Sequence, residues 1–195
     1  MSQEGLPVLL VGAGLPQIAR LAGEAKSYAE RLFQYPAVGA LDPTSAAQAV
    51  EKPIIDEDAE IVPDALQKIV HDTKGYPFFL QEWASVVWNY AEGTPITLSD
   101  VEQSYIETIA LLDEGFFKVR IDRLTKAEVQ FVTAMANLGD GPYAMADIAR
   151  SMDRTLRSLG PVRASIISKG MIYSTDHGYL DFTVPLFAEF MRRQS

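Results

Sequence analysis

The sequence contains no cysteine and only two histidines, His71 and His177. Without cysteine there is no disulfide, thiolate zinc site, iron–sulfur cluster or cysteine nucleophile. Two histidines exclude a multi-histidine metal site, so we expect no metal. Neither histidine accompanies a serine in a nucleophile-elbow context, and we expect no catalytic residues in this chain.

Long apolar runs are also missing. The apolar stretch Leu6–Leu15 is interrupted by prolines and glycines, and it is shorter than the roughly 20 residues that a membrane-spanning helix needs. It lacks a basic leader, so a secretory signal is not expected. We therefore expect a cytoplasmic protein without membrane contact, and the lack of cysteine fits a reducing compartment.

The chain is short of positive charge, with 17 Lys and Arg against 26 Asp and Glu, a net charge of −9. Residues 1–123 carry 9 basic and 19 acidic residues, and residues 124–195 carry 8 basic and 7 acidic residues. An acidic chain repels a polyanion as a whole. Any nucleic-acid contact is therefore expected in the last third.

The phosphate-binding loop G-x-x-x-x-G-K-[ST] is absent, because Ala25 replaces the glycine before Lys26. No strand ends in paired acids that would hold magnesium. The chain by itself is thus not expected to hydrolyse a nucleotide. Gly12-Ala13-Gly14 follows an apolar run, but Gln17 stands where a dinucleotide fingerprint has its third glycine.

Residues 1 to about 50 predict an α/β segment. The continuous apolar run 6–11 is typical of a buried strand, and helix 17–24 and a second strand over 32–39 follow it. Asp42 and Pro43 predict the start of a helix that ends near Pro53. Two strands do not make a stable sheet, so this segment is expected to be the remnant of a larger sheet domain.

Residues 54 to about 123 predict helices that begin at Pro63, Pro77 and the capping box Thr97–Asp100. Gly75 is expected to end the first of these helices in a left-handed cap. The third helix is expected to continue past a break near Gly115. Gly75-Tyr76-Pro77 then forms a corner between two helices.

Residues 124–195 predict a winged helix-turn-helix. A helix starts at the capping box Thr125–Glu128, a short helix follows over 145–152, and a third begins at Pro161 after a turn over 153–158. Asp176-His177-Gly178 predicts the turn of a β-hairpin. A terminal helix begins at Pro185 and ends at Arg192-Arg193.

In a helix-turn-helix the third helix enters the major groove, and the wing reaches phosphate or the minor groove. The candidate DNA contacts are the basic residues on or near these elements: Arg154, Arg157, Arg163, Lys169 and His177. Winged helices also contact proteins, and few basic residues are present here, so both roles stay open.

The order of these parts resembles the C-terminal part of a bacterial P-loop ATPase of the AAA or STAND type, related to archaeal replication initiators. The resemblance is carried by the segments Gly12-Ala13-Gly14-Leu15-Pro16 and Gly75-Tyr76-Pro77, and by the winged-helix tail. It implies a mainly α fold in three parts: an α/β core remnant over 1–42, a helical lid over 43–123 and a winged helix-turn-helix over 124–195.

The resemblance also implies a nucleotide site. Its residues would be Gly75, Tyr76 and Pro77, with Pro77 against the adenine, and Gly12 at the first sensor strand. No arginine follows the corner in the place of a second sensor, because Gln81 and Glu82 stand there. ATP or ADP would belong to the full-length parent, itself an ATPase, and no tight binding is expected here. The expected partners are the missing ATPase core, DNA, and a protein partner or another copy.

The alternative is a free-standing winged-helix transcriptional regulator that binds DNA and whose N-terminal region senses a ligand or dimerises. The frame upstream of Met1 separates the two hypotheses.

Overall fold

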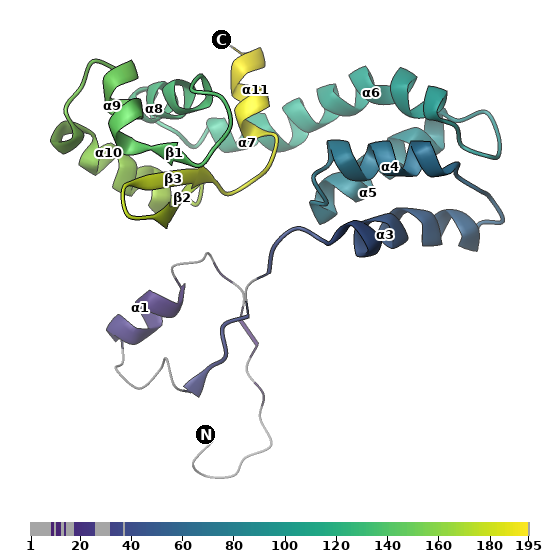
Figure 1. The fold of residues 1–195 in the computed structure, drawn as a ribbon, viewed down its shortest axis with the longest axis horizontal. Helices are drawn as coiled ribbons and strands as arrows, with labels where there is room; N and C mark the ends of the chain where they lie inside the picture. The colour runs from purple at the N-terminus through teal and green to yellow at the C-terminus, as the bar shows by residue number, and fades with distance from the viewer. Residues whose placement is uncertain are drawn as a thin grey trace. The chain divides into compact units, whose positions relative to one another are not determined.

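The structure is a computed structural model that describes residues 9, 11, 12, 14, 18–25, 32–36 and 38–194. The chain divides into two units, Met1–Val38 and Gly39–Ser195. The fold is mainly helical with one small antiparallel sheet, as the sequence predicts (Figure 1). The predicted boundaries at 42/43 and 123/124 stay predictions.

The first unit contains helix α1, Ile18–Ala25, close to the predicted helix 17–24. The two predicted strands are wrong at the positions described. Leu9 and Val11 lie outside any strand and are largely exposed, and residues 32–36, 38 and 39 form no strand either. An extended segment needs a hydrogen-bonded neighbour to be a strand, and the described residues here provide none. The remaining positions of both segments lie outside the described residues.

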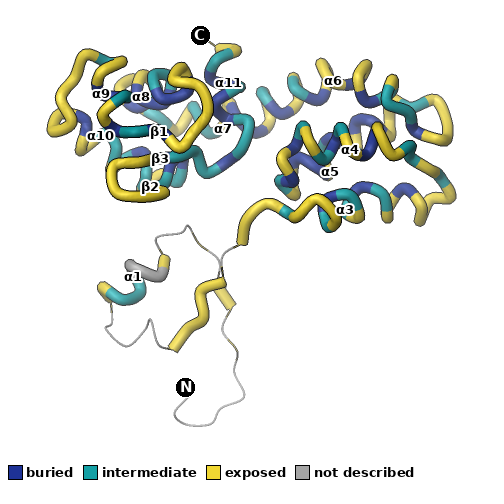
Figure 2. Tube along the Cα trace, in the orientation of Figure 1, coloured by how far each residue is buried: buried dark blue, intermediate teal, exposed yellow. Residues whose placement is uncertain are grey.

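Four helices open the second unit. They are α3 Pro43–Asp56, α4 Pro63–Asp72, α5 Pro77–Tyr90 and α6 Leu98–Leu112. Their inward faces meet in an apolar core, visible as the dark blue stretches of Figure 2. Trp83 and Phe79 of α5 are its largest buried side chains. The predicted capping box at Thr97 is confirmed, because Thr97 and Asp100 bond reciprocally.

Helix α3 runs through Pro53 instead of ending near it. Proline removes the N–H that would bond the carbonyl four residues earlier, here Ala49. The Gln81 side chain of α5 donates to that carbonyl at 3.1 Å. Val50 and Ile54 are buried on the core side, so packing and a replacement hydrogen bond together extend the helix.

The break expected near Gly115 is a π-helical turn, Asp113–Phe117, which leads directly into α7, Lys118–Ile121. A π-turn inserts an extra residue without ending the helix. Phe116 and Phe117 are both buried there, although consecutive residues of a regular helix point in different directions.

The C-terminal part places a three-stranded sheet against helices. The elements are α8 Lys126–Ala136, β1 Tyr143–Ala144, α9 Met145–Ser151, α10 Leu156–Ser168, β2 Ile172–Asp176, β3 Tyr179–Phe182 and α11 Phe187–Arg193. The antiparallel strand order is β1-β3-β2. The hairpin and the capping box at Thr125 are present as predicted. Strand β1 was not predicted, because two residues are too few for a pattern.

Two predicted helix starts are wrong. Helix α10 begins at Leu156, not Pro161, because the Thr155 side chain accepts from the Ser158 N–H and caps it there. Pro161 lies inside the helix, on an exposed face where water can reach the freed carbonyl. The terminal helix begins at Phe187, two residues after Pro185, because Leu186 has a left-handed backbone with φ 64°.

Helix α11 joins the helical and C-terminal parts of the second unit. The Phe117 ring stacks on Phe190 at 5.1 Å and meets Phe187 edge-on at 5.9 Å. Arg193 makes a bidentate ion pair with Asp113, and Lys74 pairs with Glu189 at 2.9 Å. An aromatic stack flanked by two ion pairs therefore links residues far apart in the sequence.

Every helix in the described ranges is too short or too polar to cross a lipid bilayer.

Candidate functional site

The Gly75–Pro77 corner is built by a backbone that only glycine tolerates. Gly75 has φ +67°, and a Cβ there would lie 2.5 Å from the Leu41 carbonyl oxygen. The Gly75 carbonyl accepts the Leu41 N–H at 2.9 Å. Pro77 is the exposed first residue of α5, and no side chain caps this helix start. The corner thus fixes α5 against the segment that leads into α3.

An aromatic cluster surrounds the corner. The Tyr76 ring lies 4.7 Å from Phe79 and 6.4 Å from Phe116. Phe78 stacks on Phe116 with centroids 4.9 Å apart and an interplanar angle of 21°. The tertiary fold therefore brings the π-turn, some 40 residues further along the chain, onto the corner.

Arg120 belongs to this cluster, and sequence reasoning did not find it. Its guanidinium carbon lies 3.5 Å above the centre of the Phe116 ring, and its Nη1 donates to the Phe116 carbonyl at 3.0 Å. Burial lowers the pKa of Arg120 below its usual value. The sequence has no arginine directly after Pro77, and no local pattern connects Arg120, much further along the chain, with the corner.

Gly12, the fourth predicted nucleotide residue, belongs to the first unit and is exposed. No atom lies within 4 Å of a Cβ placed on it, so the described surroundings do not require glycine there. Its role toward a nucleotide stays a prediction.

The predicted DNA-contacting residues fall into two groups. Arg154, in the turn between α9 and α10, and Arg157, in the first turn of α10, are exposed. Neither side chain forms a hydrogen bond or ion pair with the described residues. His177 is exposed at the hairpin tip beside Gly178, which has φ +81°. These three are available to a partner.

Arg163 and Lys169 are engaged within the protein. Arg163 Nη2 donates to the Ser174 hydroxyl of β2 at 2.7 Å and ties α10 to the hairpin. Lys169 Nζ pairs with the Glu128 carboxylate at 2.7 Å and donates to the Arg123 carbonyl at 2.9 Å. Their positive charges therefore serve internal contacts in this conformation.

Glu128 is the buried acid in this region, only 3% exposed. Burial alone would raise its pKa, but hydrogen bonds from Lys169, Ser165 and Thr125 outweigh burial and lower the pKa to about 2. The carboxylate closes the capping box of α8 and receives two side chains of α10. It is therefore a structural charge that locks two helices together.

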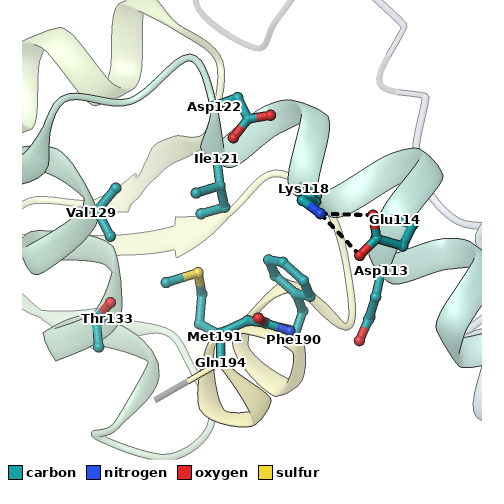
Figure 3. Close-up of a pocket in the computed structure, with 10 residues that line it drawn as sticks. All are labelled: Asp113, Glu114, Lys118, Ile121, Asp122, Val129, Thr133, Phe190, Met191 and Gln194. Atoms are coloured by element: carbon teal, nitrogen blue, oxygen red, sulfur yellow. Dashed lines mark hydrogen bonds and ion pairs between the residues drawn. The ribbon is translucent and has the colours of Figure 1, made fainter.

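A pocket of about 460 Å³ lies between the π-turn and α7, α8 and α11 (Figure 3). Ile121, Val129, Phe190 and Met191 give it an apolar lining. The acids at its edge are largely neutralised, because Glu114 pairs with Lys118 and Asp113 with Arg193. In the part of the chain described, no group of three or more potential metal ligands occurs.

Comparison with known proteins gives one partial family match. Residues 114–191 match a family model described as "Domain of unknown function (DUF8462)". The match covers less than half of the chain. No curated protein matches.

Several solved structures of RuvB from Thermotoga maritima are similar. One is titled a Holliday junction branch migration motor, with 14% identity, a TM-score of 0.37, and coverage of 73% of this chain and 47% of RuvB. Two RuvB point variants match with 15% and 16% identity and a TM-score of 0.39, over 73% of this chain and 46% of theirs. The chain thus spans less than half of RuvB.

RuvB is an AAA-type P-loop ATPase. A TM-score below 0.5 does not establish a common fold.

Proposed function

We propose that this chain is the lid and winged-helix portion of an AAA- or STAND-type regulatory ATPase. In the parent protein, ATP or ADP would contact the corner Gly75-Tyr76-Pro77, and the nucleotide state would set the position of residues 124–194. The phosphate-binding loop and magnesium ligands would come from a separate ATPase core, so this chain alone is not catalytic.

The observation that carries this proposal is the set of contacts between α11 and the helices before it. Coupling between two sites requires contacts that differ between two states. The aromatic stack of Phe117 on Phe190 and the ion pairs Asp113–Arg193 and Lys74–Glu189 link the corner's helices to the C-terminal part. A displacement of α4 and α5 by nucleotide would therefore pass to the C-terminal part.

The element order α8, β1, α9, α10, β2, β3 supports a winged helix-turn-helix in this part. Helix α10 would be its third helix and the β2–β3 hairpin its wing. We infer that this module contacts a protein partner or another copy of the chain in preference to DNA, because Arg163 and Lys169 are engaged internally. A cytoplasmic location fits this role.

The genomic frame upstream of Met1 tests the proposal. We expect it to encode, in frame, a Gly-Lys-Ser/Thr loop followed by a strand ending in acids. The longer protein should then bind ATP, and changing the loop lysine to alanine should abolish that binding. A stop codon directly upstream would contradict the proposal.

The second candidate is a free-standing DNA-binding regulator. Arg154 and Arg157 favour it, because both side chains are exposed and neither has a partner among the residues that the structure describes. Fluorescence anisotropy with duplex DNA would measure binding at several salt concentrations. Two phosphate contacts predict a slope of about −2 in log K against log salt. The double change Arg154→Ala and Arg157→Ala should abolish binding, while Arg150→Ala, which removes a cation already paired with Asp147, should not.

A further inference from the structure

Helix α10 exposes an apolar face where a helix that reads DNA bases would carry polar side chains. Its exposed residues are mostly apolar or small: Leu156, Arg157, Gly160, Pro161 and Ala164, with Ser158 and Ser168. The two serine hydroxyls donate to carbonyls of their own helix. Bases are recognised chiefly by side chains that form hydrogen bonds with them, and Arg157 is the one of these side chains left to donate. The exposed face of α10 is therefore suited to contact a protein.

Two arginines without partners flank Leu156, which is 54% exposed. Arg154 and Arg157 are exposed, and neither pairs with an acid among the described residues. Positive charge near a helix N-terminus opposes the helix dipole, so it is unfavourable in the isolated chain. The exposed Asp153 beside them would repel a polyanion such as DNA. This surface suits a partner that joins an apolar side chain to a few carboxylates.

The end of α3 has this chemistry. Ile55 is 57% exposed, and the exposed acids Asp56, Glu57 and Asp58 follow it directly. None of the three carboxylates pairs with a cation of the residues that the structure describes. Residues 51–60 carry five acids and one lysine. Acids at a helix C-terminus also oppose the dipole, and charges that break a local preference are expected where a protein has a function.

The two surfaces lie at opposite ends of the second unit, with α10 at the left of Figure 1 and the end of α3 at the right. They therefore do not meet within one chain. We propose that the exposed face of α10 docks on the end of α3 in a second copy of this chain. Leu156 of one copy packs on Ile55 of the other, and Arg154 and Arg157 pair with the carboxylates of residues 56–58. This inference rests on the proposed function, because it names the partner for the protein contact proposed for the C-terminal part.

The contact is heterologous, because it joins two different surfaces. Each docked pair keeps one free surface of each kind, so further copies add head to tail. Few side chains take part, and small interfaces of this kind are weak. Salt screens ion pairs between exposed side chains. We therefore expect an association that grows with protein concentration and disappears at high salt.

Sedimentation velocity of the full 195-residue chain tests the contact, from micromolar to millimolar concentration in low and high salt. We expect the sedimentation coefficient to rise with concentration in low salt and to keep the monomer value in high salt. The double change Arg154→Glu and Arg157→Glu should weaken association at least about tenfold, because it turns attraction into repulsion. Asp56→Lys with Glu57→Lys should weaken it equally. Circular dichroism checks that each variant is folded.

Reversal of the charges on both surfaces separates a direct contact from structural damage. A chain with all four changes has acids on α10 and lysines at the end of α3, so its two surfaces are complementary again. Its association should return to near the wild-type strength. An equimolar mixture of the two reversal variants should also associate, because each variant keeps the surface that the other needs. Damage to the fold would give neither recovery.

The matched controls change the net charge equally at other places. Arg123→Glu with Lys126→Glu reverses two exposed cations near the start of α8. Glu102→Lys with Glu107→Lys reverses two exposed acids beside Ile106 of α6, which is also exposed. Neither control should weaken association as the test variants do. An equal effect of the α6 control would overturn the assignment of the α3 end.

A wild-type chain that stays monomeric at millimolar concentration in low salt would overturn the inference. Failure of the fourfold variant to recover would overturn it as well. If the wild type stays monomeric and binds duplex DNA, and the α10 reversal variant does not, then α10 contacts DNA and the inference is wrong. The assignment of the chain to the lid and winged-helix portion of an ATPase is decided separately, by the upstream frame.

Discussion

The Glu128 carboxylate stays ionised although it is buried. The hydrogen bonds that it accepts stabilise the charged form by more than burial destabilises it. Thr125, Ser165 and Lys169 all donate to it. Removing one partner of a buried ion pair destabilises the fold, because it leaves the other charge uncompensated. The residue pattern around Thr125 predicted the capping box, but the partners from α10 come only from the fold.

We expect Glu128→Gln to lower the free energy of unfolding by about 2 kcal/mol, below the range for a fully buried pair because Lys169 keeps some water contact. The folded pKa of about 2 is below the ordinary value of 4.5. The wild-type stabilisation is thus present above pH 4.5 and lost as the pH falls toward 2. Urea denaturation at several pH values measures this loss, which should be missing in the variant. Glu114→Gln changes an exposed acid and keeps Glu128, so it should keep the pH-dependent loss. A Glu128→Gln variant that loses as much stability as the wild type when the pH falls would contradict the prediction.

Gly75 is required for its backbone and for the space it leaves. We expect Gly75→Ala to cost at least about 2 kcal/mol, because φ is +67° and the added Cβ would overlap the Leu41 carbonyl. Thermal unfolding followed by circular dichroism measures the loss. Gly93→Ala is the control, since nothing lies within 4 Å of a Cβ there. Equal melting temperatures for the two variants would show that the corner is not strained.

Helices in this chain end where their hydrogen bonds and packing end, and not at each proline. Pro53 and Pro161 both lie inside helices, whereas Pro43, Pro63 and Pro77 begin them. The sequence rule that proline opens a helix was right for the second group because each residue before it has an extended backbone. The sequence predicted a helix end near Pro53 and a helix start at Pro161, and both predictions are wrong because packing and capping residues decide these boundaries.

The hydrogen bond from the Gln81 side chain to the Ala49 carbonyl of α3 can be tested by mutation. We expect Gln81→Ala to destabilise the protein by about 1 kcal/mol, because the carbonyl freed by Pro53 loses its donor. The rate of amide hydrogen exchange should rise in the last turn of α3. The change Asn89→Ala on the same helix removes an exposed side chain and should leave exchange in α3 unchanged. Unaltered exchange in Gln81→Ala would mean that water replaces the bond without cost.

The second unit as a whole depends on the packing of Phe117 against α11. Phe117 is fully buried and contacts Phe187 and Phe190 across a long sequence separation. The helices before it and the sheet after it are therefore expected to unfold together, because each loses its partner surface when the other opens.

We expect Phe117→Ala to lower stability by about 3–5 kcal/mol and to split one calorimetric transition into two. Val119→Ala, a half-exposed neighbour, should keep a single transition near the wild-type temperature. Two calorimetric transitions in the wild-type protein would show that the contacts of Phe117 with α11 do not couple the helices before it to the sheet after it.

The sequence by itself determined the mainly helical fold and the starts at Asp42, Thr97 and Thr125, because capping and periodicity are local. It also determined the hairpin turn at Gly178, and it pointed to the Gly75 corner as a place that needs glycine. These features depend on residues within a few positions of one another, so their pattern is visible in the chain.

Only the tertiary structure decided which charges are available and which residues meet the corner. Arg163 and Lys169 are alike in sequence to Arg154 and Arg157, but the fold gives them Ser174 and Glu128 as partners. Arg120 reaches the corner because the π-turn brings Phe116 onto Phe78 across nearly 40 residues. Contacts over such separations depend on packing, and the local pattern does not specify them.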